Sequence, residues 1–365
     1  MTESQEVVEP TAASGWDPAA FRDGIEACVQ DFIDGQDSWL TELGEDARRL
    51  VEHARVSVSG GKRFRASFCW WGHLAIAEPT DAPALLRACA SLELLHASAL
   101  VHDDYMDASD VRRGRPATHR AFETLHREQG WNAGAAQYGA AAAILLGDLL
   151  LSWSDELLRT CGLPAERVLD ALRYFDLTRT EVVAGQFLDV SAQARGATDV
   201  EGAMRVVRYK SAKYSIERPL HIGAALAGAS GDVLLQLSRF GLPLGEAFQL
   251  RDDLLGVFGD PEVTGKPAGD DLVEGKRTVL IALAMNALDA PDRKHLDTSL
   301  GRPLTAAEVA ELRTLITGSG AAEQVESVIT SLTERALGAL AEADLRDDAR
   351  AVLRDLAAAA TQRGF

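Results

Sequence analysis

The chain has 365 residues, and 47% of them are apolar, which is ordinary for a soluble globular protein with a sizeable core. Its 55 Asp and Glu residues outnumber its 37 Lys and Arg residues, and the formal net charge is −18. This balance argues against a general nucleic-acid binder, which needs a basic face to neutralise phosphates. It does not exclude small anionic substrates, because local clusters of cations bind those.

The N-terminal segment, the cysteines and the most apolar stretch of the chain indicate where the protein is located. Residues 1–15 are acidic and polar, lack the basic and apolar regions of a signal peptide, and are expected to be disordered. The four cysteines are far apart without metal-binding spacing, so the cytoplasm, a reducing compartment, is the default location. The most apolar stretch, Gly139 to Leu151, is interrupted by Asp148 and too short to span a bilayer. We interpret it as a buried helix and expect no integral membrane segment.

From about Asp17 onward, apolar residues recur at three- and four-residue steps, which predicts helices. Alternating strand patterns are scarce, and the best one, Val56 to Ser59, is very short. Residues 303–365 are also expected to be helical and amphipathic. The expected breaks between helices are Gly60-Gly61, Arg113 to Pro116, Gly162 to Pro164, Gly241 to Pro243 and Pro261 to Gly269. We therefore predict an all-α fold, with one large domain over residues 16–365 built as a helical bundle around a central cavity.

Two aspartates within Leu100 to Asp107 are the first candidate site. Asp103 and Asp107 are four residues apart, so on a helix their carboxylates share a face. Such a pair suits Mg²⁺, which takes carboxylates, waters and phosphate oxygens as ligands. A solvated acidic helix face is the alternative interpretation. The apolar helix before the pair, Ser91 to Val101, favours the wall of a buried site instead.

Basic segments accompany this pair. The arginines of Arg112 to Arg115 follow it directly, either as a surface loop with weak ion pairs or as a clamp on a diphosphate. In Gly60 to Arg65, which lacks the spacing of a Walker loop, we expect Lys62 and Arg65 to share one helical face.

Later in the chain, Phe248 to Asp260 repeats the arrangement of paired aspartates followed by glycines and cations. The repetition predicts that both pairs face one cavity and hold several Mg²⁺ ions around one diphosphate.

With these motifs in this order, the chain resembles the trans-isoprenyl diphosphate synthases, or polyprenyl synthetases, most of all the bacterial geranylgeranyl diphosphate synthases. The resemblance covers roughly residues 50–285. The motifs are GGKRFR at 60–65, LLHASALVHDDYMD at 94–107, RRGRPATH at 112–119, GQFLD at 185–189, YKSAK at 209–213, FQLRDDLLGVFGD at 248–260 and GKPAGDDLVEGKRT at 265–278. The resemblance implies an all-α fold around a deep cavity, usually as a homodimer. It also implies head-to-tail condensation of isopentenyl diphosphate with an allylic diphosphate.

The resemblance also implies roles by position. Asp103 and Asp107 are expected to bind Mg²⁺ that bridges the allylic diphosphate, with Asp104 in support. Asp252 is expected to hold a further Mg²⁺ with Asp253 in its hydration shell, so that the catalytic centre takes about three Mg²⁺ ions. The residues expected on the allylic side are Arg112, Lys210, Ser211, Gln249, Lys266 and Lys276. Those expected to hold isopentenyl diphosphate are Lys62, Arg65, His96 and Arg113. Those expected to stabilise the carbocation with their dipoles are Gln186, Lys210 and Ser211.

One departure from the family pattern is Gly256, which stands where the second motif has its third aspartate. Metal binding there is expected to be weaker, with Asp260 or water as a substitute, and Gly256→Ala is expected to be mild. Three other functions are alternatives. A class I terpene cyclase would carry a different second motif, and a non-catalytic subunit of a heteromeric synthase would lose one aspartate-rich region. A helical interaction protein would leave the paired motifs unexplained.

Product length is predicted from the residues that precede Asp103. Ala99 and Ser98 are small, whereas bulky aromatic residues near that level stop growth at C15 in this family. One helical turn rises about 5.4 Å, on the order of one isoprene unit. We therefore expect a shaft that is open past C15 and closed further down by Leu95 and Leu92. The predicted main product is geranylgeranyl diphosphate, C20, and a longer-chain or C15 product is the alternative.

Overall fold

The computed structural model describes residues 16–196, 198–260 and 269–362, and nearly all of them lie in helices. The strands in these ranges are the short antiparallel pair β1 (Val111–Arg112) and β2 (Arg115–Pro116). The helices are α1 (Pro18–Leu40), η1 (Thr41–Leu43), α2 (Glu45–Val58), α3 (Phe64–Leu74), α4 (Ala82–Met106), α5 (Thr118–Glu128), α6 (Ala135–Arg159), α7 (Ala165–Arg195), α8 (Val200–Val206), η2 (Val207–Glu217), α9 (Arg218–Leu226), α10 (Gly231–Phe258), α12 (Asp270–Glu274), α13 (Val279–Ala287), α14 (Ala290–Ser299), α15 (Ala306–Gly318), α16 (Ala321–Glu342) and α17 (Asp347–Thr361). The predicted all-α fold is confirmed.

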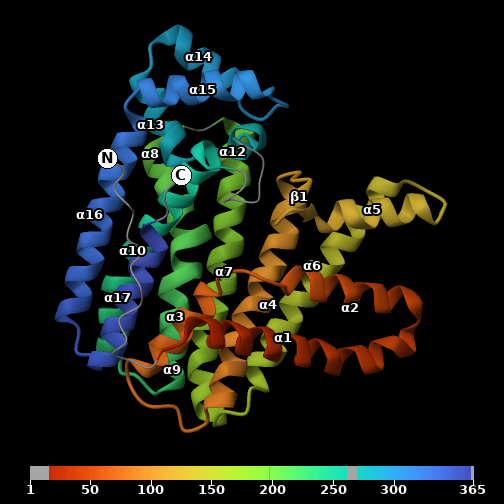
Figure 1. The fold of residues 1–365 in the computed structure, drawn as a ribbon, viewed down its shortest axis with the longest axis vertical. Helices are drawn as coiled ribbons and strands as arrows, with labels where there is room; N and C mark the ends of the chain where they lie inside the picture. Colours follow the sequence, from red (N-terminus) through yellow and green to blue (C-terminus); the bar gives the residue numbers. More distant parts are fainter. Residues whose placement is uncertain (1–15, 197, 261–268, 363–365) are drawn as a thin grey trace, which may run out of the picture.

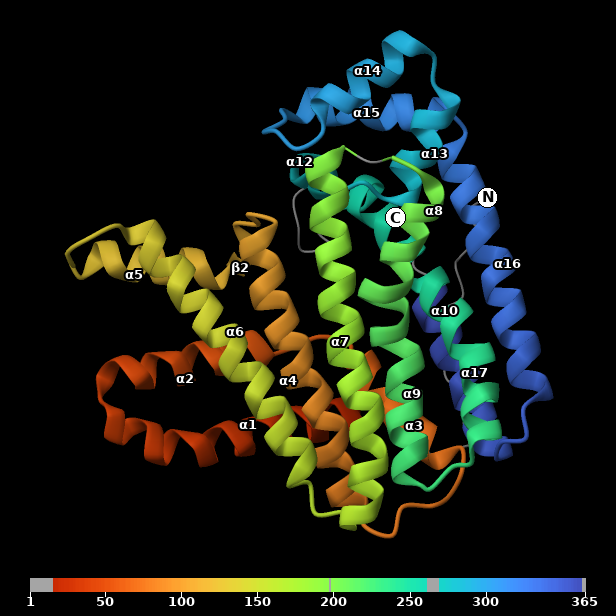
Figure 2. The same ribbon diagram turned by 180° about the vertical axis from the view of Figure 1, so that it is seen from behind.

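Long helices that run side by side form the body of the molecule, with α4, α6, α7, α9 and α10 at its centre (Figures 1 and 2). The pair α1 and α2 projects from one side of this bundle, as α5 does, and α14 and α15 lie across one end. α16 packs along α10. One group of buried apolar side chains fills the bundle, and a second group joins α8, the later part of α10 and the helices α12 to α16. The bundle thus has a packed base and a separate packed cap.

Helix α4 shows why the central helices form where they do. Asp81 precedes its first turn and accepts a hydrogen bond from the Ala84 backbone N at 2.8 Å, and Pro83 lies in that turn, where no N–H partner is needed. The helix is mostly apolar until Val101 and is largely buried. A helix of this kind belongs in a core. It carries the first aspartate-rich motif at its carboxyl end.

The short alternating pattern at Val56 to Ser59 lies at the end of α2 and the residue after it, and forms no strand. One local expectation is wrong. The expected break at Gly241 to Pro243 lies inside the continuous helix α10. A Cβ at Gly241 would lie 2.9 Å from the Leu220 side chain, so the glycine permits close packing of α10 against α9. This buried packing holds the helix together through Pro243, which lacks an N–H.

The other expectations about chain organisation are confirmed where the structure describes the chain. The segments at 60–61 and 162–164 connect helices, and 113–116 forms the turn and second strand of the β1–β2 pair between α4 and α5. Helices α15, α16 and α17 account for most of residues 303–362. The expected disorder of residues 1–15 and most of the expected break at Pro261 to Gly269 lie outside the described residues.

Helix α6 differs from its prediction in burial. Gly139 to Leu151 is helical, as expected, but Ile144 and Leu145 are 45% and 59% exposed. α6 packs mainly against α4 and α5 and also contacts α2 and α7, and the face that carries Ile144 and Leu145 is exposed among the described residues. Both α4 and α6 are long and apolar enough to cross a membrane by length and composition, but core helices pass the same test and α4 is mostly buried. The apolar face of α6 therefore needs an explanation other than the core of this chain.

Candidate active site

A cavity of about 1150 Å³ is lined by residues of α4, α7, η2 and α10 together with the basic loops. The side chains predicted for the site that line it are Lys62, Arg65, His96, Ala99, Asp103, Arg112, Arg113, Gln186, Lys210, Ser211, Gln249, Asp252, Asp253 and Lys276. Lys266 lies outside the described residues. The fold thus brings the two aspartate-rich motifs and their basic loops to one cavity.

The carboxyl end of α4 supplies the first pair of carboxylates. Asp103 lies in the helix and Asp107 caps its end, and the Nζ of Lys210 lies 3.2 Å from Asp103 Oδ1 and 2.6 Å from Asp189 Oδ2. Burial alone would raise the pKa of Asp103, but the neighbouring cations, Lys210 first, outweigh it and hold this pKa at about 2. Burial and the adjacent Asp103 raise the pKa of Asp107 to about 6. The carboxylates of Asp103 and Asp107 therefore repel each other, as their four-residue spacing indicated.

Asp104 has a different position from its two neighbours. Its side chain is buried, and its Oδ1 accepts a hydrogen bond from Arg112 Nε at 2.9 Å. The same oxygen also accepts from the Nη2 of Arg112. The Asp104 carboxylate therefore holds the Arg112 guanidinium at the cavity wall. Its expected supporting role would act through Arg112.

The second pair lies on α10 and differs from the first. Gln249 Nε2 donates to Asp253 Oδ1 at 2.8 Å, and burial followed by the nearby Asp271 carboxylate raises the pKa of Asp253 to about 8. Asp271 was not predicted from the sequence. A Cβ at Gly256 would lie 2.9 Å from Asp271 Oδ1 and closer still to its Cγ and Oδ2, nearer than real Cβ atoms approach. A side chain at position 256 would have to displace the Asp271 carboxylate, and the expectation that Gly256→Ala is mild stays a prediction.

Lys276 connects the two motifs. Its Nζ lies 2.6 Å from Glu274 Oε2, 3.4 Å from Asp271 Oδ1 and 3.5 Å from Asp107 Oδ2. Burial alone would lower the pKa of Lys276, but these carboxylates, Asp271 first, outweigh it and raise the pKa well above its usual value. The buried Lys276 ammonium group thus offsets the charge of Asp107 in the first motif and of Asp271 and Glu274, which follow the second.

The carboxylate oxygens fit Mg²⁺. Asp103 Oδ1 and both side-chain oxygens of Asp107 are buried, and within the described residues their polar contacts are the ion pairs of Asp103 Oδ1 with Lys210 and of Asp107 Oδ2 with Lys276. Oxygen ligands of this kind are the ones Mg²⁺ takes, together with water and substrate phosphates. Among residues 16–196, 198–260 and 269–362, no three acidic, His or Cys side chains converge on one point. A bound Mg²⁺ would therefore complete its shell with phosphate and water oxygens.

The second set of cations surrounds an aromatic side chain that the sequence analysis missed, Tyr214. The Arg65 guanidinium lies 4.2 Å from the centre of the Tyr214 ring and donates to Ser215 Oγ at 2.8 Å, and His96 Nδ1 lies 2.8 Å from the Tyr214 hydroxyl. Burial and the neighbouring arginines lower the pKa of His96 well below its usual value. Burial raises the pKa of Tyr214 to about 12. Both side chains are thus neutral hydrogen-bonding groups near pH 7.

The local geometry of Lys62 differs from the expectation. Helix α3 begins at Phe64, so Lys62 lies in the preceding loop and does not share a helical face with Arg65. Arg63, the residue between Lys62 and the start of α3, has a φ of 54°, in the left-handed region. Lys62 and Arg65 still line the same cavity, because the loop rather than a helix brings them together.

The apolar part of the cavity includes Ala99 and Leu151 but not every residue predicted for the shaft. Ser98 faces α6, where its Oγ donates to the Gly147 backbone O at 2.7 Å. The structure therefore does not support a role for Ser98 in the cavity wall. Leu95 and Leu92 are buried in the core, at earlier positions of α4. Ala99 is the predicted chain-length residue that the cavity reaches.

A helical cavity with carboxylates and cations at its polar end and an apolar wall beyond them suits an enzyme that binds a diphosphate attached to an apolar chain and keeps water from the reacting carbon. Sequence comparison matches the polyprenyl synthetase family over residues 47–316. The chain is 32% identical to a geranylfarnesyl diphosphate synthase of Natronomonas pharaonis, over 87% of this chain and 91% of the relative. It is also 32% identical to a geranylgeranyl diphosphate synthase of Mycobacterium tuberculosis, over 80% and 78%.

A solved structure agrees with these relatives. The geranylgeranyl pyrophosphate synthase of Corynebacterium glutamicum, complexed with isoprenyl diphosphate and magnesium, is 39% identical and superposes with a TM-score of 0.93. The match covers 96% of this chain and all of that one. The chain belongs to the polyprenyl synthetase family. It is a prenyltransferase with trans-prenyl diphosphate synthase activity.

Proposed function

We propose that this chain condenses isopentenyl diphosphate with an allylic diphosphate in a Mg²⁺-dependent reaction whose main product is geranylgeranyl diphosphate, C20. The observation that carries the proposal is one cavity that is lined by Asp103 of the first aspartate pair, both aspartates of the second pair, both cation sets and the small side chain of Ala99. Relatives named for C20 and for geranylfarnesyl products are similarly close, so a C25 product is the second candidate.

The allylic diphosphate is proposed to bind between the two aspartate pairs. Asp103, which stays ionised at neutral pH, and Asp252 would hold Mg²⁺, and up to about three ions fit the family pattern. Bound Mg²⁺ would neutralise negative charge on the departing diphosphate. The ammonium groups of Lys210 and Lys276 and the Arg112 guanidinium add positive charge at the same end of the cavity.

The carbocation left by ionisation must be kept from water. Leu100, Leu151 and Val182 line the cavity with apolar groups that exclude water, and the polar side chains of Gln186 and Ser211 can turn their dipoles toward the cation. We place isopentenyl diphosphate against Lys62, Arg65, Arg113 and the neutral His96. Its double bond would then face the cation.

We further propose that a second copy of the chain covers the open face of α6 and α7. Val183 and Phe187 on α7 line the cavity but are 64% and 72% exposed, and they accompany the exposed Ile144 and Leu145 of α6. Exposed apolar patches of this kind mark interaction surfaces. A second copy on this face would cover the cavity wall at Val183 and Phe187, which supports a homodimer. Light scattering should give about twice the 39.2 kDa of one chain, and a monomer would contradict this proposal.

The function is tested by incubating the purified protein with Mg²⁺, isopentenyl diphosphate and geranyl or farnesyl diphosphate, followed by chromatography of the products. C20 should accumulate, and its formation should stop when Mg²⁺ is chelated. Accumulation of C25 or longer products would overturn the C20 proposal but not the condensation. Hydrolysis or cyclisation of the allylic substrate without use of isopentenyl diphosphate would overturn the condensation itself.

A further inference from the structure

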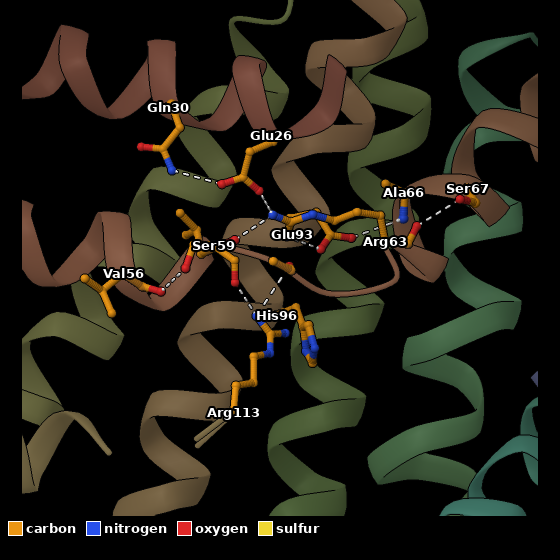
Figure 3. A network of polar contacts seen from close by, with 12 residues as sticks. Glu26, Gln30, Val56, Ser59, Arg63, Ala66, Ser67, Glu93, His96 and Arg113 are labelled. Carbon is orange, nitrogen blue, oxygen red and sulfur yellow. Dashed lines mark hydrogen bonds and ion pairs between the residues drawn. The ribbon is translucent and has the colours of Figure 1, made fainter. Parts of the chain in front are cut away.

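A buried arginine outside the binding residues named so far lies directly behind the isopentenyl diphosphate site. The side chain of Arg63 is 4% exposed and follows Lys62 in the loop between α2 and α3 (Figure 3). Its Nη1 donates to Glu93 Oε2 at 2.9 Å, and its Nη2 donates to the Val58 backbone O at 2.6 Å and to Glu26 Oε2. Burial alone would lower the pKa of Arg63, but the two carboxylates outweigh it and raise this pKa. The guanidinium is thus held by three elements, α1, α2 and α4.

Glu93 is the partner that ties this loop to α4. It lies on α4 three residues before His96 and ten before Asp103, steps that keep these side chains near one face of the helix. Its other oxygen, Oε1, accepts from the Ala66 backbone N at 3.4 Å, in the first turn of α3. α3 has no side-chain hydrogen bond from its N-cap residue, so Glu93 accepts from a helix-start amide instead. The Glu93 side chain is 4% exposed.

The loop that Arg63 anchors carries or contacts the cations assigned to isopentenyl diphosphate. Arg113 Nη1 donates to the Ser59 backbone O at 2.5 Å and to the Gly60 O at 3.3 Å, and Figure 3 shows its guanidinium reaching the loop beside His96. Gly61 leaves room for this contact, because a Cβ there would lie 3.0 Å from Arg113 Nη2. Arg113 and Lys62 are therefore positioned by the same stretch of backbone.

The left-handed backbone at Arg63 shows that this arrangement is imposed by its surroundings. A φ of 54° is uncommon for a residue with a long side chain and persists where the surrounding structure demands it. Here the guanidinium contacts and the hydrogen bond from Ser67 Oγ to the Arg63 backbone O at 3.0 Å hold the residue at both ends. Local sequence preference would not select this conformation.

We propose that Arg63 is a positioning residue that acts with Glu93 to set the distance between the isopentenyl diphosphate cations and the aspartates of α4. It does not touch substrate in this assignment. The inference rests on the proposed function, because it takes Lys62, Arg65 and Arg113 as the isopentenyl diphosphate site. Loosening the Arg63–Glu93 pair should therefore weaken isopentenyl diphosphate binding selectively and leave allylic binding in place.

The experiment compares Glu93→Gln, Arg63→Lys and Arg63→Met with the wild-type enzyme. KM is measured for isopentenyl diphosphate and for farnesyl diphosphate, and the Kd of isopentenyl diphosphate alone is measured by calorimetry. Glu93→Gln keeps shape and removes one charge, and Glu246→Gln is its matched control. Glu246 is equally buried and accepts from Arg208 Nε at 2.8 Å, away from the loop.

We expect Glu93→Gln to raise the KM and Kd of isopentenyl diphosphate about tenfold, the effect of a small displacement of positioned groups. The KM of farnesyl diphosphate should stay within about twofold of wild type, and the control should change neither. Arg63→Met should be more severe, and Arg63→Lys should restore part of the loss. Equal changes in both KM values, or an unchanged isopentenyl diphosphate Kd in a folded Glu93→Gln protein, would overturn the proposal. A wild-type enzyme that does not consume isopentenyl diphosphate would instead refute the proposed function.

Discussion

Replacing Gly256 by alanine tests whether Asp271 takes the space that a side chain on α10 would need. The new Cβ would lie 2.9 Å from Asp271 Oδ1 and closer to Oδ2, whereas ordinary contact begins at 3.4 Å. The carboxylate must therefore move by at least about 0.5 Å for Oδ1 and by more for Oδ2. Because Lys276 lies 3.4 Å from that same Oδ1, the movement also disturbs the ion pair between the two motifs.

Two effects of opposite sign determine the stability of this variant. Alanine is favoured over glycine in a helix by about 1 kcal/mol. Overpacking of a filled site costs about 1–3 kcal/mol. The expected net effect of Gly256→Ala is therefore a loss of about 0–2 kcal/mol. In an Asp271→Ala background the overlap is gone, and the same substitution should instead stabilise by about 1 kcal/mol, or about 2 °C in Tm.

The assay is a double-mutant cycle of Gly256→Ala and Asp271→Ala, read by the Tm of all four proteins. The Mg²⁺ concentration for half-maximal product formation is measured alongside. Gly256→Ala should raise that concentration, because it displaces the Asp271 carboxylate beside Lys276. An equal gain in Tm from Gly256→Ala in both backgrounds would refute the reasoning, because it would mean that Asp271 does not occupy the site.

Three further predictions concern metal, product length and pH. Asp103→Asn should lower kcat by at least about 100-fold with an unchanged circular dichroism spectrum, and normal turnover would leave the motif as a solvated helix face. Ala99→Phe should shift the product toward C15 on chromatography, and an unchanged product length would contradict the shaft wall. Burial and Arg218 lower the pKa of His221 from 6.5 to about 4. Its protonation favours the unfolded chain, so about 3 kcal/mol of stability should be lost as pH falls from 6.5 to 4. Urea unfolding should show this loss in wild type and its absence in His221→Gln, and identical pH profiles would exclude the role of His221.

The fold and the outline of the site were predictable because they depend on patterns within short segments. The four-residue spacing of Asp103 and Asp107 indicates one face of a helix, and α4 brings them to its carboxyl end. Their meeting with Asp252 was predictable only through the repeated motif, since no local rule joins residues so far apart in the chain.

The remaining features depend on tertiary contacts that a sequence pattern does not encode. The loop conformation of Lys62 depends on the buried contacts of Arg63, and the role of Tyr214 depends on packing between α4 and η2. Asp271 could be noticed only as an acid near Lys276. The exposed face of α6 shows a further limit. An apolar helix face has the same sequence pattern whether its own chain or a second chain covers it.

The helix η2, residues Val207–Glu217, is a π-helix, wider than the α-helices around it. Lys210, Ser211 and Tyr214 reach the cavity from this one stretch. A π-turn accommodates an extra residue while the flanking helices keep their register, so deleting one residue there would let an ordinary α-helix form with α9 still in place. The same deletion would change the spacing of Lys210, Ser211 and Tyr214 around the cavity. This segment should therefore accept changes of residue far more readily than changes of length, and natural variants of the enzyme should keep its residue count.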